Sequence, residues 1–454
     1  MADTFNLFTA LLLIIMGVYM MCLCGFMPFR FARVLRGLFR LFRPKKEGKK
    51  GEISPFEAFA AALGGSVGTG NIAGVASAIA IGGPGAVFWM WVSGILGMAT
   101  KYAEILVAMR FRGRDAAGAP VGGTMYCILH GMGKGAMPIA VLFSLFTVLA
   151  SLGCGNTVQA NTAAAAASEA AALLIPGSKE WAAPAVGILM AAALAAVLFG
   201  GAKRICRASA YLVPLMSFLY IGAAFAVVWT FRENLPAVLS EIFVGAFGLR
   251  PVLGGAAGFT LVRALRVGMV RGVFSNEAGI GAAPMAYASA RSGEHAEQAM
   301  LGIFEVFADT ILICTLTALA VLSSGIRIPY GNADAEGMEI ALCTLSTVME
   351  ERTAGVFLAV STVLFAFSSM LGWALYGIRA AEFLFGGRGG RCYRILFVLA
   401  SGVGAVTDAA FIWKLGETFN SLMALPNLLM LLALAPWVKK DTQAYLSLPN
   451  TRRL

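Results

Sequence analysis

The sequence predicts an all-α integral membrane protein with eleven transmembrane helices, and three observations support this fold class. Hydrophobic residues make up 59% of the 454 residues and charged residues only 13%, which is too few for a soluble chain of this length. Two of the hydrophobic stretches are broken in a similar way. Stretches long enough to cross a bilayer recur at 5–27, 54–81, 86–109, 137–168, 183–200, 208–231, 257–289, 297–323, 353–384, 394–409 and 411–437.

Lysine and arginine are distributed unevenly between the loops that join these stretches. Threading the stretches alternately across a bilayer places 24 of them on one side and five on the other. Positive charge in short loops marks the cytoplasmic side. We therefore expect a multi-pass protein of the plasma or inner membrane, with the N-terminus outside and the C-terminus in the cytoplasm.

Residues 30–53 form a basic segment between the first two stretches. Arginines recur there every three or four residues with Phe and Leu between them, which predicts an amphipathic helix on anionic lipid headgroups. Because the positive charges of the chain lie beside predicted spans, we expect no nucleic acid partner.

The two broken stretches contain a repeat. "NIAGV" at 71–75 returns as "NEAGI" at 276–280, and the spans that follow pair in order. Residues 54–231 and 257–437 therefore form two five-span halves, and an odd number of spans inverts the second half. This is the inverted-repeat plan of secondary transporters. One extra span in 1–29 precedes the repeat, and a tail, 438–454, follows it.

The breaks themselves predict a binding site. The first contains "GTGN" at 68–71 and the second "FSNEAGIG" at 274–281. A glycine inside a helix costs about 1 kcal/mol relative to alanine. A broken helix, however, offers free amides to anions and free carbonyls to cations. Close packing of glycines between helices is the alternative explanation.

Four segments resemble the alanine or glycine:cation symporter family, within the amino acid–polyamine–cation superfamily. They are "GGSVGTGNIAGVASAIAIGGPGAVFWMWVSGILGMATKYAEI" (64–105), "GGTMY" (122–126), "RGVFSNEAGIGAAPMA" (271–286) and "FAFSSMLGWALYG" (365–377). The resemblance implies a leucine-transporter-like 5+5 inverted repeat. It also implies symport of small neutral amino acids, alanine and glycine foremost, with sodium as the co-transported ion and without a cofactor.

A zwitterionic amino acid needs amide donors for its carboxylate and acceptors for its ammonium group. Thr69, Gly70 and Asn71 lie at the first break, where free amides can take the carboxylate. The second break offers carbonyls and a side-chain wall from Phe274, Ser275 and Asn276.

Two further polar or aromatic residues are substrate candidates. The resemblance favours Gln159 facing the substrate, although a hydrogen bond between helices would also satisfy this lone amide. Trp373 could cover or line the pocket, or serve as ordinary core.

The resemblance also implies a sodium site at Ser368 and Ser369. In that fold, two such hydroxyls join main-chain carbonyls to bind the ion, here those of Gly64, Val67 and Phe365. Hydroxyls that bond back to their own helix are the alternative.

Carboxylates within spans are functional candidates by default. Glu277 and Asp309 could bind sodium with Asn71, take a proton, or pair with an arginine such as Arg271. A proton-coupled symporter that uses Asp309 or Glu277 is the alternative function. Lys101 and Glu104 are expected near the cytoplasmic end of a span, snorkelling or paired.

An enzyme is not expected, because the sequence lacks the metal-binding or serine–histidine patterns of intramembrane hydrolases. Its two histidines lie in predicted loops. A channel would need a continuous polar stripe rather than a site between two halves.

Overall fold

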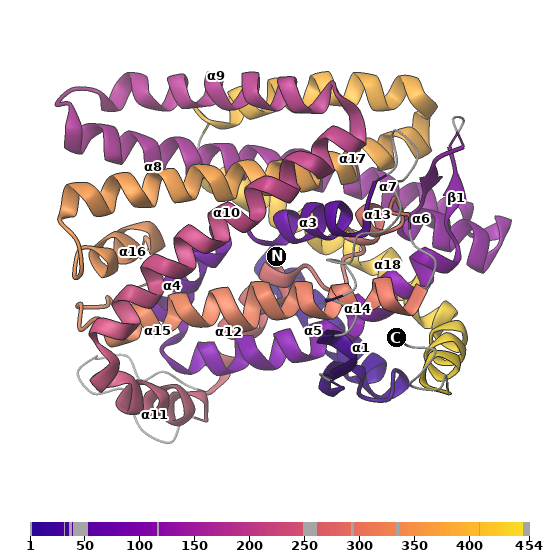
Figure 1. Ribbon diagram of the computed structural model, residues 1–454, viewed down its shortest axis with the longest axis horizontal. Helices are drawn as coiled ribbons and strands as arrows, with labels where there is room; N and C mark the ends of the chain where they lie inside the picture. Colours follow the sequence, from indigo (N-terminus) through magenta and orange to yellow (C-terminus); the bar gives the residue numbers. More distant parts are fainter. Residues whose placement is uncertain are drawn as a thin grey trace.

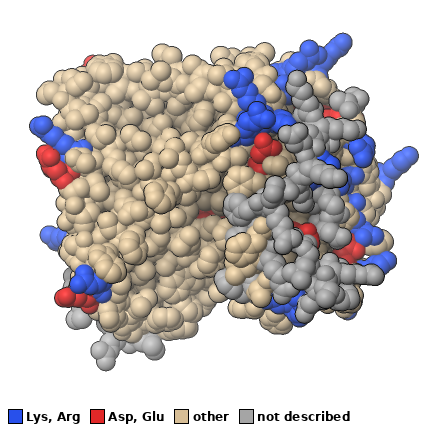
Figure 2. Space-filling view, in the orientation of Figure 1, with Lys and Arg blue, Asp and Glu red and all other residues tan. Residues whose placement is uncertain are grey.

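The computed structural model describes residues 2–30, 32–35, 39, 53–115, 118–247, 261–291, 295–332, 336–407 and 409–447. These residues are mostly helical, and most of the long helices run along the horizontal axis of Figure 1. Figure 2 shows that Lys, Arg, Asp and Glu gather at the two ends of this axis, with a wide uncharged band between them. Large apolar side chains are exposed, such as Phe218 at 78%. A surface of this kind suits contact with lipid.

The first half of the chain carries one of the two broken helices. Its main helices are α1 (Ala2–Leu23), α3 (Pro55–Ser66), α4 (Ala73–Gly82), α5 (Gly85–Arg110), α7 (Met137–Leu152), α8 (Val158–Leu174), α9 (Lys179–Leu198) and α10 (Gly201–Thr230). The 3₁₀ turn η2 (Thr69–Asn71) separates α3 from α4, and the π-turn η5 (Gly153–Thr157) joins α7 to α8.

The second half carries the other broken helix. Its main helices are α12 (Leu261–Asn276), α13 (Pro284–Tyr287), α14 (His295–Val306), α15 (Thr315–Ser323), α17 (Glu351–Gly404) and α18 (Ala409–Ser447). The π-turn η7 (Phe307–Cys314) joins α14 to α15. The second broken helix is asymmetric, because only the short α13 follows its break.

Short elements connect these helices. They are η1 (Met27–Phe29), the antiparallel strands β1 (Gly113–Arg114) and β2 (Pro120–Val121), α6 (Thr124–Cys127), η3 (Ile128–Met132), η4 (Lys134–Ala136), η6 (Arg232–Asn234), α11 (Leu235–Ala246) and α16 (Gly337–Leu345). Most of the predicted amphipathic segment 30–53 lies outside the described residues.

Several predicted boundaries differ from the observed ones, and two of the differences lie in the last part of the chain. The predicted spans 353–384 and 394–409 lie on either side of a kink in α17, at Gly386, which has a φ of +67°. Helix α18 continues to Ser447, beyond the predicted end of the last span at 437. Glycine adopts a positive φ without strain, so the chain can turn at 386 while helix resumes at once.

Within the described residues, seven helical segments are long and apolar enough to cross a membrane by length and composition. They are Gly85–Arg110, Lys134–Leu174, Lys179–Leu198, Gly201–Thr230, His295–Ser323, Glu351–Gly404 and Gly416–Ser447. The two broken helices are divided into pieces too short for this criterion, and the apolar part of α1 is Leu7–Leu23. The chain is therefore a multi-pass membrane protein.

Glycines allow α17 to approach the first broken helix closely. A Cβ atom at Gly372 would lie 2.6 Å from the Cα of Gly65. No larger side chain fits there without a shift of backbone, which is the close packing of small residues that membrane helices use. This contact holds the Ser368–Ser369 segment of α17 against the end of α3.

Candidate functional site

The first break is closed by a side chain in place of helical hydrogen bonds. Helix α3 ends at Ser66, and the backbone N–H of Gly68 then donates to Oδ1 of Asn71 at 3.0 Å. A Cβ atom at Gly70 would meet none of the described residues within 4 Å, so open space lies over this residue. The break therefore exposes main chain to a cavity, as predicted from "GTGN".

The second break is longer and strained. After Asn276 the chain has positive φ values at Glu277 (53°), Gly279 (95°) and Gly281 (79°). A positive φ is uncommon for glutamate, and such outliers are often found at functional sites. Oδ1 of Asn276 accepts from the N–H of Ala278 at 3.0 Å, so this side chain supports the turn.

A cavity of about 70 Å³ lies between the two breaks, bounded also by α8 and α17; we refer to it as the central cavity. Six of the predicted substrate residues line it: Gly70, Asn71, Gln159, Phe274, Ser275 and Trp373. The other two, Thr69 and Asn276, do not. The hydroxyl of Thr69 instead donates to Oε1 of Gln159 at 3.1 Å and so joins the first break to α8.

Trp373 reaches across the central cavity to the second break. Its Nε1–H donates to Oε1 of Glu277 at 2.9 Å, and only 1% of the residue is exposed. Pairing with Arg271 was one of the alternatives for Glu277, and no such ion pair is observed among the described residues, although both side chains line the cavity. The indole takes this position because Gly155 packs against it, where a Cβ atom would lie 2.3 Å from Cγ of Trp373.

Asp309 joins both broken helices at a second polar cluster. Its fully buried carboxylate accepts from Nδ2 of Asn71 at 2.7 Å and from the hydroxyls of Ser275 and Thr310, both at 2.8 Å. It lies in η7, and π-turns of this kind recur at functional sites. The structure therefore brings together Asn71 and Asp309, two of the three residues predicted for a second cation, whereas the third, Glu277, bonds to Trp373.

The hydroxyl pair of Ser368 and Ser369 lies against the first broken helix, as expected. The carbonyl that one of these hydroxyls contacts is, however, not one of those expected. Ser369 donates to the carbonyl of Gly65 at 3.0 Å, which was not in the expected set of Gly64, Val67 and Phe365. Ser368 lies beside Gly64, where a Cβ atom would be 2.5 Å from its Oγ. The rotation of each helix about its axis decides which carbonyl a hydroxyl meets, and residue spacing alone does not reveal it.

Sequence reasoning missed a buried ion pair below the cavity. Nζ of Lys101 lies 3.0 Å from Oε1 of Glu305, and both side chains are 0% exposed. Tyr287 donates to the other carboxylate oxygen at 2.8 Å, and Ser66 to Oε1 at 3.4 Å. These contacts tie α3, α5, α13 and α14 together. Lys101 therefore pairs rather than snorkels, and Glu305 is a carboxylate within a predicted span that the rule applied to Asp309 would have selected.

Glu104 is also fully buried, so snorkelling is wrong for this residue as well. Its Oε1 accepts from the N–H of Gly281 at 3.0 Å and from Nδ2 of Asn427. Asn427 in turn donates to the carbonyl of Gly279 at 2.8 Å. The second break is therefore held by α5 and α18.

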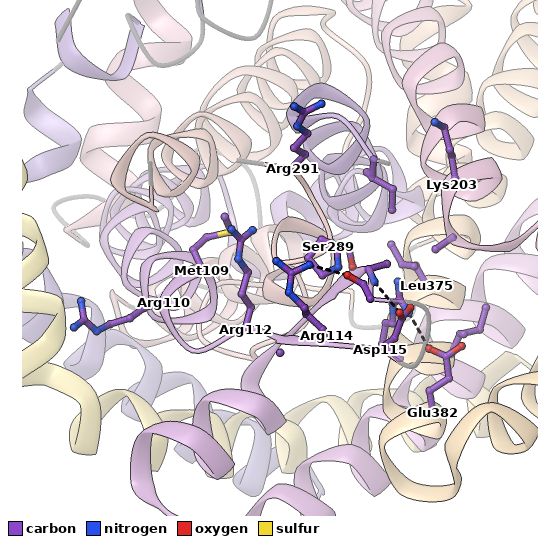
Figure 3. A pocket seen from close by; sticks show the side chains of 18 of the residues that line it. Met109, Arg110, Arg112, Arg114, Asp115, Lys203, Ser289, Arg291, Leu375 and Glu382 are labelled. Carbon is purple, nitrogen blue, oxygen red and sulfur yellow. Dashed lines mark hydrogen bonds and ion pairs between the residues drawn. The ribbon is translucent and has the colours of Figure 1, made fainter. Parts of the chain in front are cut away.

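A second, much larger cavity of about 1040 Å³ lies at one end of the molecule; we refer to it as the basic vestibule. Its charged lining has two carboxylates, Asp115 and Glu382, and seven cations: Arg110, Arg112, Arg114, Lys203, Arg291, Arg379 and Arg394. Figure 3 shows Arg112 and Arg114 extending side by side from the segment after α5. Burial, and then the charge of Arg114, lowers the pKa of Arg112.

Comparison with known proteins gives consistent matches over most of the chain. A family model described as the sodium:alanine symporter family matches residues 3–452. The sodium/alanine symporter AgcS of Methanococcus maripaludis is 38% identical over 405 residues, which cover 88% of this chain and 85% of AgcS. The probable sodium/glutamine symporter GlnT of Bacillus subtilis is 34% identical over 434 residues, 93% of this chain and 84% of GlnT.

Among solved structures, the crystal structure of MhsT in complex with L-phenylalanine matches with a TM-score of 0.55. The match covers 88% of this chain and 94% of the MhsT chain, at 16% sequence identity. At this identity the likeness concerns the fold alone, and the helices in Figure 1 are arranged in a way similar to that structure.

Proposed function

Because this chain belongs to the sodium:alanine symporter family, we propose that it carries a small neutral amino acid, alanine or glycine, into the cell by alternating access. The family consists of symporters, so the chain is a transporter rather than an enzyme, and sodium is its co-transported ion. The central cavity between the two broken helices is the observation that carries the proposed substrate site.

The substrate carboxylate binds at the first break, at Thr69, Gly70 and Asn71. The open space over Gly70 supports this, because a ligand can approach the main chain there without meeting a side chain. Phe274 and Ser275 form the opposite wall, with Asn276 supporting the turn behind them. Gln159 and Trp373 complete the pocket, and a cavity of about 70 Å³ suits the smallest amino acids.

One sodium ion binds between the end of α3 and the hydroxyls of Ser368 and Ser369, with carbonyl oxygens of Gly64, Val67 and Phe365. The buried hydroxyl of Ser368 supports this assignment, since it has no hydrogen-bond partner among the described residues. The contact of Ser369 with Gly65 adds that residue's carbonyl to the candidates.

A second cation binds at Asn71 and Asp309, with the hydroxyl of Ser275 close by. A buried carboxylate beside hydroxyl and amide groups offers the oxygen ligands that sodium prefers. Because Asn71 also belongs to the substrate pocket, occupation of this site and of the central cavity are coupled through one side chain.

Transport follows from rocking of the spans that carry the broken helices against the rest of an eleven-span, 5+5 inverted-repeat fold. Sodium couples to this motion only if it binds the outward-open state better than the inward-open one. The N-terminus lies outside and the basic vestibule faces the cytoplasm, which agrees with the positive-inside rule. The basic segment 30–53, most of which lies outside the described residues, is our candidate for contact with anionic headgroups.

Uptake of labelled alanine into proteoliposomes tests this function, with either a sodium gradient or an equal proton gradient imposed. We expect accumulation driven by sodium, competition by unlabelled glycine, and a sodium requirement about tenfold higher in Ser369→Ala. Accumulation driven by the proton gradient alone would instead support the alternative, a proton-coupled symporter that uses Asp309 or Glu277.

A further inference from the structure

The carboxylate of Glu277 is only half satisfied by the protein. The residue is 6% exposed and lines the central cavity. Its Oε1 accepts from the indole of Trp373 at 2.9 Å, while its buried Oε2 has no hydrogen-bond partner among the described residues. A buried carboxylate oxygen without a donor is costly, and such groups in membrane proteins are usually functional.

No lysine or arginine of the described chain forms an ion pair with Glu277. The buried Nζ of Lys101 lies 3.0 Å from Oε1 of Glu305, so this cation is already paired with another carboxylate. The other buried carboxylates near the breaks have more donors. Glu104 accepts from Gly281 and Asn427 at Oε1, and although its Oε2 has no partner among the described residues, Glu104 does not line the central cavity. Asp309 has three side-chain donors, Asn71, Ser275 and Thr310.

The position of Glu277 also places its charge opposite the first break. Glu277 follows α12 directly. Its backbone φ is 53°, a value that residues other than glycine rarely adopt. The surrounding fold must hold this strain, and Trp373 fixes the carboxylate from across the cavity. The arrangement aims one acidic group at the same small space that Gly70 opens from the other side.

From this geometry we propose that Glu277 receives the ammonium group of the transported amino acid, with Trp373 as the residue that positions its carboxylate. This inference rests on the proposed function. The substrate then spans the cavity, its carboxylate at the amides of the first break and its ammonium group at Oε2 of Glu277. The site therefore selects zwitterions and rejects acids of the same size that lack a cationic group.

L-lactate is the informative probe, because a hydroxyl replaces the ammonium group of L-alanine with little change in shape. Binding of labelled alanine to the purified full chain in sodium, with lactate as competitor, measures the preference between them. In the wild type we expect lactate to bind at least about 30-fold more weakly, since losing one partner of a buried charge contact costs about 2–5 kcal/mol. Lactate within about threefold of alanine would overturn the assignment, whatever any variant does.

Glu277→Gln is the matched substitution, because the amide oxygen of glutamine can still accept from Trp373. We expect alanine affinity to fall at least about 30-fold while lactate affinity stays within about threefold of its wild-type value. Glu277→Asp, which keeps the charge, should retain the preference for alanine. A merely structural role would weaken both ligands equally.

Glu417→Gln provides the comparison within the cavity, since Glu417 is a further carboxylate that lines it, from α18. We expect the alanine-to-lactate preference to persist in this variant. A preference lost in Glu417→Gln but kept in Glu277→Gln would overturn the proposal. If the wild type binds no amino acid in sodium, the proposed function itself fails, which these arms distinguish from a wrong choice of carboxylate.

Discussion

The central cavity has a volume of about 70 Å³ and the basic vestibule one of about 1040 Å³, and the two regions hold charge in different ways. Around the central cavity, carboxylates such as Asp309 and Glu277 are buried and meet a few fixed donors. In the vestibule, cations such as Arg114 and Arg291 are exposed. Water and salt screen exposed charges over about 8 Å at physiological ionic strength. Single substitutions should therefore have large effects at the cavity and small ones in the vestibule.

The largest expected effect is on stability, at the ion pair below the cavity. Lys101→Met leaves Glu305 buried without its cation, and breaking a buried pair costs about 3–5 kcal/mol. Lys179→Met is the matched control, because Lys179 pairs with Glu169 where both side chains are 64% exposed. Thermal unfolding of the purified variants should show a marked loss for Lys101→Met and little change for Lys179→Met. Equal losses would remove the contrast between buried and exposed charge.

Removing the charge of Asp309 should weaken sodium binding next most strongly. We expect Asp309→Asn to raise the sodium concentration needed for half-maximal alanine binding about 100-fold, since one partner of a buried charge contact is lost. Asp441→Asn changes the same type of residue where it pairs with Arg110 of the vestibule, at 2.7 Å. A sodium requirement unchanged in Asp309→Asn would argue against a cation at this cluster.

Loss of one neutral ligand should have a smaller effect. Ser369→Ala removes the hydroxyl next to the Gly65 carbonyl, and we expect sodium affinity to fall about tenfold, in line with about 1.4 kcal/mol for a lost polar contact. Ser361→Ala removes a buried hydroxyl from the same helix, away from the break. Sodium titrations of alanine binding should separate the two, and equal shifts would contradict a site at Ser369.

The size of the cavity can be tested by adding one methyl group. Gly70→Ala has room to fold, because a Cβ atom there meets nothing within 4 Å, whereas at Gly372 it would lie 2.6 Å from Gly65. We expect Gly70→Ala to shift the preference from alanine towards glycine about fourfold, corresponding to about 0.8 kcal/mol for one methyl group. Gly372→Ala should instead lower the yield of folded protein. An unchanged preference in Gly70→Ala would place the substrate side chain elsewhere.

The vestibule should show the smallest effect, and one that salt removes. A positive lining lowers the local concentration of sodium and favours its release. We expect sodium on the vestibule side to inhibit uptake by the double variant Arg112→Gln/Arg114→Gln about twofold more strongly than it inhibits the wild type at low ionic strength. At high ionic strength the double variant and the wild type should not differ. A large, salt-independent loss of uptake would mean that these arginines bind substrate directly.

Much of the fold and part of the site could be predicted from the sequence. Glycines and polar residues inside apolar stretches predicted the positions of both breaks. They do so because backbone N–H and C=O groups without helical hydrogen bonds must, within a membrane, meet another partner or a cavity. The resemblance to transporters selected Gln159 and Trp373, and the structure places both at the central cavity.

The rest required three-dimensional contacts. Whether Ser369 meets Gly64 or Gly65 depends on how two helices are rotated against each other, and this rotation leaves no trace in residue spacing. Lys101 lay near the predicted end of a span, so its complete burial against Glu305 depended on a helix far away in sequence. The bond between Trp373 and Glu277 was not expected for a related reason, since Trp373 comes from the other side of the cavity.

A cryo-electron microscopy structure of the full chain with alanine and sodium would test the central claim most directly. We expect density for the amino acid in the central cavity, between Gly70 and Glu277 and against Trp373, with ions near Ser369 and Asp309. Density for alanine in the basic vestibule, with the central cavity empty, would contradict the assignment of the site to the two breaks.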